Sequence, residues 1–111
     1  MSEQEYLHEV MRTCAEHGSV ERLVLGAMGL AGEAGEVVDL IKKTRFQGHP
    51  LDTAKLKDEL GDVMWYLALL CYTLGFSLED IRAGNVAKMH RRYPHGFDVE
   101  RSLNRQEGGR A

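Results

Sequence analysis

Two pairs of acidic residues are the part of this sequence best suited to chemistry. Glu33 and Glu36 form an E-x-x-E pair, and Glu59 and Asp62 form an E-x-x-D pair further along the chain. On a helix, a three-residue step places two side chains on one face about one turn apart, so each pair presents two carboxylates side by side. The spacing therefore predicts a cation site built from both pairs.

Each acidic pair shares its helical face with apolar residues. The apolar neighbours are Leu30, Val37 and Leu40 in the first segment and Tyr66, Leu69 and Leu70 in the second. A face of this kind turns inward, and close carboxylates repel each other by about 4 kcal/mol per pair at an effective dielectric of about 20, before any desolvation cost. We therefore expect the four carboxylates to converge in a dry interior around a positive ion.

The segment between the two pairs is expected to fold them together. Residues 45–52 contain Gly48-His49-Pro50 and are predicted to form a loop, so that the flanking helices make an antiparallel hairpin. Glu36 and Glu59 lie about two turns from this break, and Glu33 and Asp62 lie about one turn further out. The two pairs should meet at one height.

Apolar periodicity and capping residues predict an all-α fold, an antiparallel bundle of four to five helices. The expected capping residues are Ser2 with Glu5, Ser19, Asp52 or Thr53, and Ser77 with Asp80. The expected helices cover residues 3–17, 20–44, 54–74 and 78–92. We expect residues 1–94 to form one helical domain and residues 95–111 to be an arm that packs on a neighbour, or a partly disordered end. A bundle of this size often completes its burial by oligomerising, so we expect the chain to associate with further copies of itself.

The second predicted helix contains glycines that weaken it. Each glycine in a helix interior costs about 1 kcal/mol relative to alanine. Gly26 and Gly29 fall on the carboxylate face, one turn before the first acidic pair. The missing side chains leave room for a ligand or for a closely packed helix, and the two explanations are compatible.

Composition and charge narrow the class of protein. The net charge of −3 gives no large basic field for duplex nucleic acid. Cys14 and Cys71 are isolated thiols without metal-site or disulfide spacing. No cationic start precedes an apolar run, and the longest apolar stretch, residues 63–71, is too short to span a bilayer. We expect a cytoplasmic protein that binds no membrane.

The candidate ligands are all carboxylates, which favours a hard cation. Mg²⁺, with Mn²⁺ as a substitute, binds oxygen ligands of this kind, whereas Zn²⁺ prefers nitrogen and sulfur. Glu5-x-x-His8 has the look of half a di-iron motif, but ferritin-like sites need two such segments and two further glutamates. A surface position for His8 is the simpler reading.

Later in the chain lie basic residues that could bind the phosphates of a Mg²⁺-bound substrate. Asn85, Lys88 and Arg92 fall on one face of the fourth predicted helix, with Arg91 beside them. The stripe is either a solvated face or a phosphate-binding face, and a buried acidic site opposite would favour the second. Lys42 and Lys43 could also reach a phosphate, although lysines near a helix C-terminus are expected from the helix dipole alone.

Three segments resemble a known family. GLAGEAGEVVDLIKK, KLKDELGDVMWYLALL and NVAKMHRRYP are similar to the MazG-like all-α nucleoside triphosphate pyrophosphohydrolases over residues 23–94. The resemblance implies hydrolysis of a nucleoside or deoxynucleoside triphosphate between the α and β phosphates, giving the monophosphate and pyrophosphate. It also implies a dimer or a dimer of dimers.

The resemblance assigns roles to individual residues. The metal-binding and catalytic positions correspond to Glu33, Glu36, Glu59 and Asp62, with Glu33 as a ligand or as the base that takes a proton from water. The substrate-contacting positions correspond to Tyr66, Asn85, Lys88, Arg91 and Arg92, to which Lys43 is added as a candidate. Tyr66 can equally be a core residue. Trp65, the only tryptophan, is expected to pack away from the carboxylates or in a subunit contact.

Two other functions stay open at this level. A non-catalytic helical module could bind a nucleotide or a protein and keep the metal as a structural element. A related enzyme could act on another phosphorylated nucleotide. The sequence identifies candidate residues that bind phosphate but none that bind the base.

Overall fold

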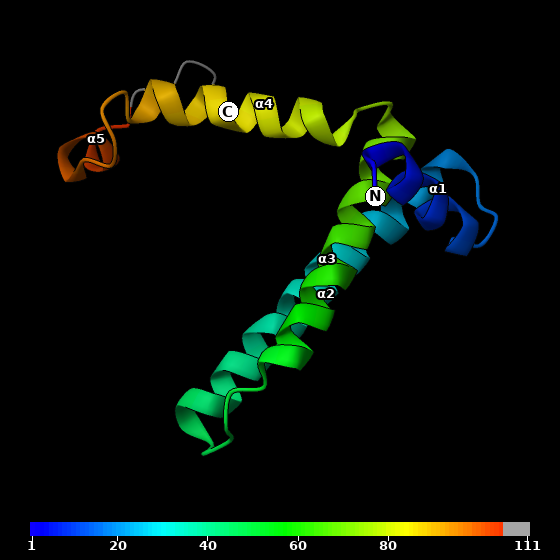
Figure 1. The fold of residues 1–111 in the computed structure, drawn as a ribbon, viewed down its shortest axis with the longest axis horizontal. Coiled ribbons are helices and arrows are strands. Elements are labelled where there is room, and N and C mark those ends of the chain that lie inside the picture. The colour runs from blue at the N-terminus through cyan, green and yellow to red at the C-terminus, as the bar shows by residue number, and fades with distance from the viewer. Residues whose placement is uncertain (106–111) are drawn as a thin grey trace. The chain divides into compact units, whose positions relative to one another are not determined.

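The described part of the chain consists of helices and the segments that join them. The computed structural model describes residues 1–105 (Figure 1). Its helices are α1 (Glu3–Thr13), α2 (Ser19–Phe46), α3 (Thr53–Leu74), α4 (Leu78–Arg92) and α5 (Val99–Leu103). Within these residues the only β-type pairing is an isolated bridge between Pro94 and Gly96. The prediction of an all-α fold is confirmed.

The chain divides into two compact units. The first is Met1–Phe76, and the second begins at Ser77. In the first unit, α2 and α3 form the predicted antiparallel hairpin and lie side by side along their length, and α1 packs on α3 (Figure 1). The predicted domain division at residue 94 stays a prediction, and residues 106–111 of the predicted tail lie outside the described residues.

The core of the first unit lies where α1 meets α3. Its buried members are Val10, Ala68 and Leu69. Around them pack the partly buried residues Tyr6, Leu7, Met11, Cys14, Leu25 and Trp65. Because this core occupies only one end of the hairpin, the rest of α2 and α3 is held mainly by the contact between the two helices.

Gly26 and Gly29 allow α2 and α3 to approach closely. A Cβ atom on Gly26 would lie 2.7 Å from Leu70 Cγ, and one on Gly29 would overlap the ring of Tyr66, with its Cζ 2.5 Å away. Such distances are too short for real atoms, so a side chain at either position would have to displace Leu70 or Tyr66. Of the two predicted explanations for these glycines, the closely packed helix is confirmed.

Most helix ends follow the predicted capping residues. Ser2 and Glu5 form a reciprocal capping box at α1, and Ser77 and Asp80 form another at α4. Asp52, rather than Thr53, caps α3, and its carboxylate accepts a hydrogen bond of 3.0 Å from the backbone N–H of Lys55. The third helix ends at Gly75, whose φ of 79° is the left-handed conformation that glycine adopts without strain.

Several helix ends differ from the prediction, and α2 continues through Arg45 and Phe46, which were predicted to lie in the loop. The first helix ends at Thr13 instead of His17, and in this last turn the Thr13 hydroxyl donates to the carbonyl oxygens of Glu9 and Val10, at 2.8 and 3.1 Å. Ser19 is the first residue of α2 and not its cap. Gly18 is the N-cap, in an extended conformation and without a side-chain hydrogen bond.

The two capping boxes predict a loss of stability in acid. Hydrogen bonds from the backbone and side chain of Ser2 lower the pKa of Glu5, and those of Ser77 lower the pKa of Asp80 in the same way. A lowered pKa in the folded state contributes stability above about pH 4, the ordinary pKa of these carboxyls, and this contribution is lost as the pH falls through the lowered pKa. Thermal unfolding of the protein and of Glu5→Gln and Asp80→Asn between about pH 2 and 7 measures the effect.

We expect these variants to melt below the unmodified protein at neutral pH and to converge with it in acid. Glu16→Gln, in the exposed segment after α1, is the control and should melt like the unmodified protein throughout. A constant difference across the whole pH range would contradict the assignment of the loss to these two carboxyls.

The second unit is built around α4 and the segment that follows it. No residue of α4 or α5 is buried. The guanidinium of Arg101 on α5 donates hydrogen bonds to the carbonyl oxygens of Arg92 and Arg91, at 2.7 and 3.2 Å, and so caps the last turn of α4. The ring of Phe97 packs against that of Tyr93 with centroids 5.3 Å apart. The described part of the predicted arm therefore contains a short helix anchored to the end of α4.

No single described helix has both the length and the apolar character needed to cross a membrane. Only α3 and α4 taken together across their break have them, and they do so by length and composition alone.

Candidate metal centre

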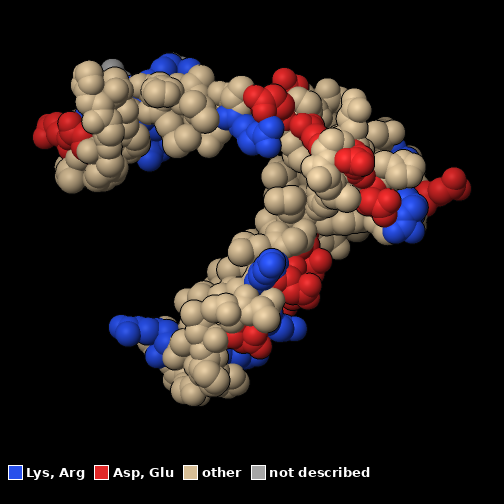
Figure 2. Space-filling model, viewed as in Figure 1, with Lys and Arg blue, Asp and Glu red and all other residues tan. Residues whose placement is uncertain are grey.

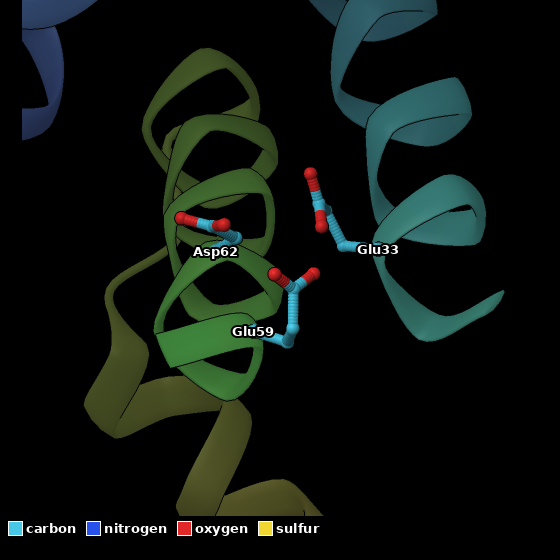
Figure 3. Close-up of side chains that lie close together, drawn as sticks. All are labelled: Glu33, Glu59 and Asp62. Atoms are coloured by element: carbon cyan, nitrogen blue, oxygen red, sulfur yellow. The ribbon is translucent and has the colours of Figure 1, made fainter. Parts of the chain in front are cut away.

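Three of the four predicted carboxylates lie together between α2 and α3. Glu33, Glu59 and Asp62 each offer one oxygen atom, and these atoms all lie within 4.8 Å of one another. Figure 3 shows Glu33 extending from α2 toward Glu59 on α3, with Asp62 beside them. We call these three residues the acidic cluster. It is the group of potential metal ligands found among the described residues.

The register of the hairpin brings the cluster together. The close contacts of Gly26 with Leu70 and of Gly29 with Tyr66 fix how α2 and α3 are aligned. Continuing this antiparallel alignment along the hairpin places Glu33 level with Asp62, and the next turn of α2 level with Glu59. The register therefore agrees with the prediction that the two acidic pairs meet at one height.

Glu36 lies outside the acidic cluster and is exposed. Its charge contributes to the raised pKa of Glu33, so it lies near the cluster without joining it. The prediction that all four carboxylates converge is thus wrong for Glu36 in this structure. A three-residue step turns about 300° around a helix, so Glu36 points about 60° away from Glu33, toward solvent, where it avoids the repulsion of the other three.

The predicted dry interior is also wrong for part of the cluster. Glu59 is buried, with 8% of its surface exposed, whereas Glu33 is half-buried and Asp62 is exposed. A seam between only two helices buries the side chain at its centre and leaves those on its flanks in contact with water. The cluster is therefore an open site that a solute can reach from one side.

The cluster carries negative charge that the described residues do not compensate. Within residues 1–105, no lysine or arginine forms an ion pair with any of its three members. A hydrogen bond shared with Glu59 raises the pKa of Glu33, and partial burial and the charges of Asp62, Glu59 and Glu36 raise it further. A bound cation would offset this repulsion and favour the ionised carboxylate of Glu33.

The donor set fits a hard divalent cation. Every potential ligand atom in the cluster is a carboxylate oxygen, the ligand type that Mg²⁺ and Mn²⁺ prefer. Glu5, the first ligand of the alternative di-iron motif, is engaged in a capping box instead. Its carboxylate accepts a 2.6 Å hydrogen bond from the backbone N–H of Ser2.

Comparison with known proteins decides the family. Residues 25–97 match the model of the MazG nucleotide pyrophosphohydrolase domain. The chain belongs to this family. The Gene 37 protein of Mycobacterium phage L5 is 38% identical over 82 residues, which cover 70% of this chain and 72% of the phage protein. No solved structure matches the chain.

The MazG domain holds all the predicted site residues. Its matched range includes the acidic cluster, Glu36 and α4, and it begins after α1. Membership of the family implies a nucleotide pyrophosphohydrolase in general, and the family as a whole depends on a metal ion. Among residues 1–105, the acidic cluster is where such an ion fits.

The lysines at the end of α2 have acidic partners of their own. Lys42 Nζ and Lys43 Nζ lie 3.3 and 3.0 Å from the two carboxylate oxygens of Asp39. Lys43 also lines a pocket of about 510 Å³ at the hairpin loop, with His49 and Asp52 among its neighbours. That pocket does not include the acidic cluster. Both lysines are paired with Asp39, and the contact of Lys43 with a substrate stays a prediction.

The phosphate-binding stripe predicted from Asn85 to Arg92 lies on α4 of the MazG domain. Asn85, Lys88 and Arg91 are exposed, and Arg92 is half-buried. Because α4 is a regular helix through this stretch, Asn85, Lys88 and Arg92 share a face as predicted. Arg101 secures the turn that carries Arg91 and Arg92, which the sequence alone did not indicate.

Aromatic residues adjoin the acidic cluster. A pocket of about 370 Å³ is lined by Thr13, Glu33, Asp62, Trp65 and Tyr66. Tyr66 packs on Gly29 as a core residue would, and it also lines this pocket, while its contact with a substrate stays a prediction. Trp65 packs against the core as predicted, but the expectation that it lies away from the carboxylates is wrong. The signal was the Asp62-x-x-Trp65 spacing, which places the two side chains one turn apart.

Proposed function

We propose that this protein hydrolyses nucleoside or deoxynucleoside triphosphates between the α and β phosphates, releasing the monophosphate and pyrophosphate. The observation that carries the proposal is the acidic cluster of Glu33, Glu59 and Asp62, placed between two helices of a MazG domain. Such an enzyme would control nucleotide pools or remove unwanted triphosphates.

Mg²⁺ is the proposed cofactor, held by Glu33, Glu59 and Asp62, with Mn²⁺ as a substitute. When bound, the ion would supply positive charge for the phosphates and for the negative charge that develops in the transition state. Glu36 lies one turn from Glu33, near enough for its long side chain to turn toward a positive site, and it is proposed as an additional ligand.

The chain's own residues would handle the proton and the phosphates. Hydrolysis needs a carboxylate to take the proton of the attacking water, and Glu33, half-buried at the edge of the cluster, is proposed as this base or as a ligand. Asn85, Lys88, Arg91 and Arg92 supply amide, ammonium and guanidinium donors suited to phosphate oxygens and are proposed to bind them.

Product analysis tests the reaction. The protein is incubated with Mg²⁺ and a panel of nucleoside and deoxynucleoside triphosphates, and the products are separated by ion-exchange chromatography. We expect pyrophosphate and monophosphate in equal amounts, and no turnover when the divalent cation is removed with a chelator. Release of inorganic phosphate and a diphosphate would mean a different reaction class.

We also propose that the protein assembles as a dimer or a dimer of dimers. The first unit leaves a row of large apolar residues uncovered on α2 and α3, and Met28, for example, is 70% exposed. On α2, Val20, Val24 and Met28 recur every four residues and so share one face, and on α3 Leu60 and Met64 do the same. Figure 2 shows wide areas without charged side chains on the α2–α3 hairpin. Such patches are typical of a surface that another protein covers.

The mass in solution tests the assembly. Light scattering coupled to gel filtration should give about two or four times the chain mass of 12.5 kDa. Met28→Glu, which places a charge in the apolar row, should shift the protein to the monomer mass. Gln47→Glu at the exposed hairpin loop is the control and should leave the mass unchanged. A monomeric unmodified protein at micromolar concentration would contradict the proposal.

A further inference from the structure

The pocket beside the acidic cluster is lined by two chemically different kinds of side chain. Glu33 and Asp62 give it carboxylates, and Trp65 and Tyr66 give it aromatic rings. Thr13 of α1 completes the lining, so three helices contribute to one pocket of about 370 Å³. This volume is within the range of small-molecule sites in proteins.

The indole ring of Trp65 is held in place from two sides. Its Nε1–H donates a hydrogen bond of 3.0 Å to the Thr13 hydroxyl, and its ring meets that of Tyr66 edge to face, with centroids 5.0 Å apart and planes inclined by 76°. Tyr66 is in turn confined by the backbone of Gly29. The ring is therefore set before any ligand arrives, which lowers the entropy lost on binding.

The way the indole is held decides what it can offer a ligand. Its only donor is used by Thr13, and the Thr13 hydroxyl itself donates to a backbone carbonyl oxygen of α1. Neither group has a proton to give to a ligand. With its only polar group engaged, the indole offers a ligand its carbon surface, which makes its most extensive contact with a planar group by stacking.

We propose that Trp65 is the stacking wall for the nucleobase of the substrate, and that Thr13 is the residue that positions it. The inference rests on the proposed function. A metal-bound phosphate chain at the carboxylates leaves the other end of the same molecule beside the aromatic rings, and the planar, apolar part of a nucleotide is its base. Because every base has a π face, stacking alone discriminates weakly between bases, and the enzyme should accept several of them.

The fluorescence of Trp65 gives a direct test, because it is the only tryptophan in the chain. The protein with Mg²⁺ is titrated with a nucleoside triphosphate whose α–β bridging oxygen is replaced by an imido group, and separately with inorganic tripolyphosphate. We expect the nucleotide to change the emission in a saturable way. Tripolyphosphate should compete with the nucleotide and yet leave the emission nearly unchanged.

Two substitutions separate stacking from packing. Trp65→Phe and Trp65→Leu both fill the core-facing space and both lose the indole N–H, but only phenylalanine keeps a π face. We expect Trp65→Leu to raise KM for the triphosphates about tenfold and Trp65→Phe about threefold, with kcat within about twofold and no change in the inhibition constant of tripolyphosphate. Thr13→Val should raise KM less than Trp65→Leu does.

The outcomes distinguish this inference from the proposed function. If the protein cleaves triphosphates while both Trp65 variants behave alike, or while the emission does not respond to nucleotide, only the stacking role is overturned. An emission that depends on protein concentration alone would place Trp65 in a subunit contact and would also overturn it. Failure to bind or cleave any nucleotide would overturn the proposed function itself.

Discussion

Replacing Glu59 by glutamine is expected to lower kcat/KM for nucleoside triphosphates by about 10²–10³-fold without loss of the helical fold. Glu59 is the buried member of the acidic cluster and lies between Glu33 and Asp62. Glutamine keeps the shape of the side chain but removes its charge, so the cluster loses much of its attraction for a divalent cation. Steady-state kinetics with saturating Mg²⁺ and circular dichroism of the same preparation measure both parts of the expectation.

The same substitution should stabilise the metal-free protein. Three carboxylates within 4.8 Å repel one another, and Glu59 additionally loses hydration because it is buried. Removing its charge relieves both costs, so the melting temperature in chelator should rise by several degrees, as about 1 kcal/mol of added stability implies for a chain of this size. Mg²⁺ should raise the melting temperature of the unmodified protein more than that of the variant.

Asp58→Asn is the matched control for Glu59→Gln. Asp58 precedes Glu59 on α3, is exposed and lies outside the cluster. The Asp58→Asn substitution removes one negative charge from the same helix as Glu59→Gln does. A general effect of helix charge on activity would therefore appear in both variants. Equal losses of activity in the two would contradict a specific role for Glu59. Unfolding of Glu59→Gln would favour the alternative in which the metal only holds the structure together.

The helices could be predicted from the sequence where local residues determine them. Ser77 with Asp80 opens α4, and Gly75 ends α3, because capping depends on atoms only a few residues apart. The early end of α1 depends on more than its own residues. Thr13 bonds its own helix and at the same time holds Trp65, which lies 52 positions further along the chain, so the tertiary contact helps to fix this end.

In the candidate site, too, some features follow from local sequence and others depend on tertiary structure. The spacing of Glu59 and Asp62 places both on one face of a single helix, which sequence alone can show. Whether Glu36 joins them depends on the direction of one long side chain at the edge of a two-helix seam, which periodicity does not determine. Trp65 was misplaced because apolar periodicity assigned it to the core, whereas in the structure it contacts both the core and the pocket.

Two glycines on α2 should respond in opposite directions to the same substitution. Gly29→Ala forces a methyl group into the ring of Tyr66, and we expect it to lower the free energy of unfolding by about 1–3 kcal/mol, the usual cost of overpacking. Gly32→Ala, one turn further along, meets nothing within 4 Å. It should raise the free energy of unfolding by up to about 1 kcal/mol, because alanine is the better helix former. Denaturant unfolding followed by far-UV circular dichroism measures both values.

The comparison isolates the contact between α2 and α3 from helix propensity, since both variants gain the same propensity and only one meets a neighbour. The comparison also tests the geometry of the acidic cluster, because the contact of Gly29 with Tyr66 fixes the register that sets Glu33 level with Asp62. A displaced Tyr66 ring would also disturb the wall formed by Trp65, so Gly29→Ala should weaken nucleotide binding while Gly32→Ala leaves it unchanged. If both variants became more stable, α2 and α3 would not meet at Tyr66, and the alignment that assembles the acidic cluster would be wrong.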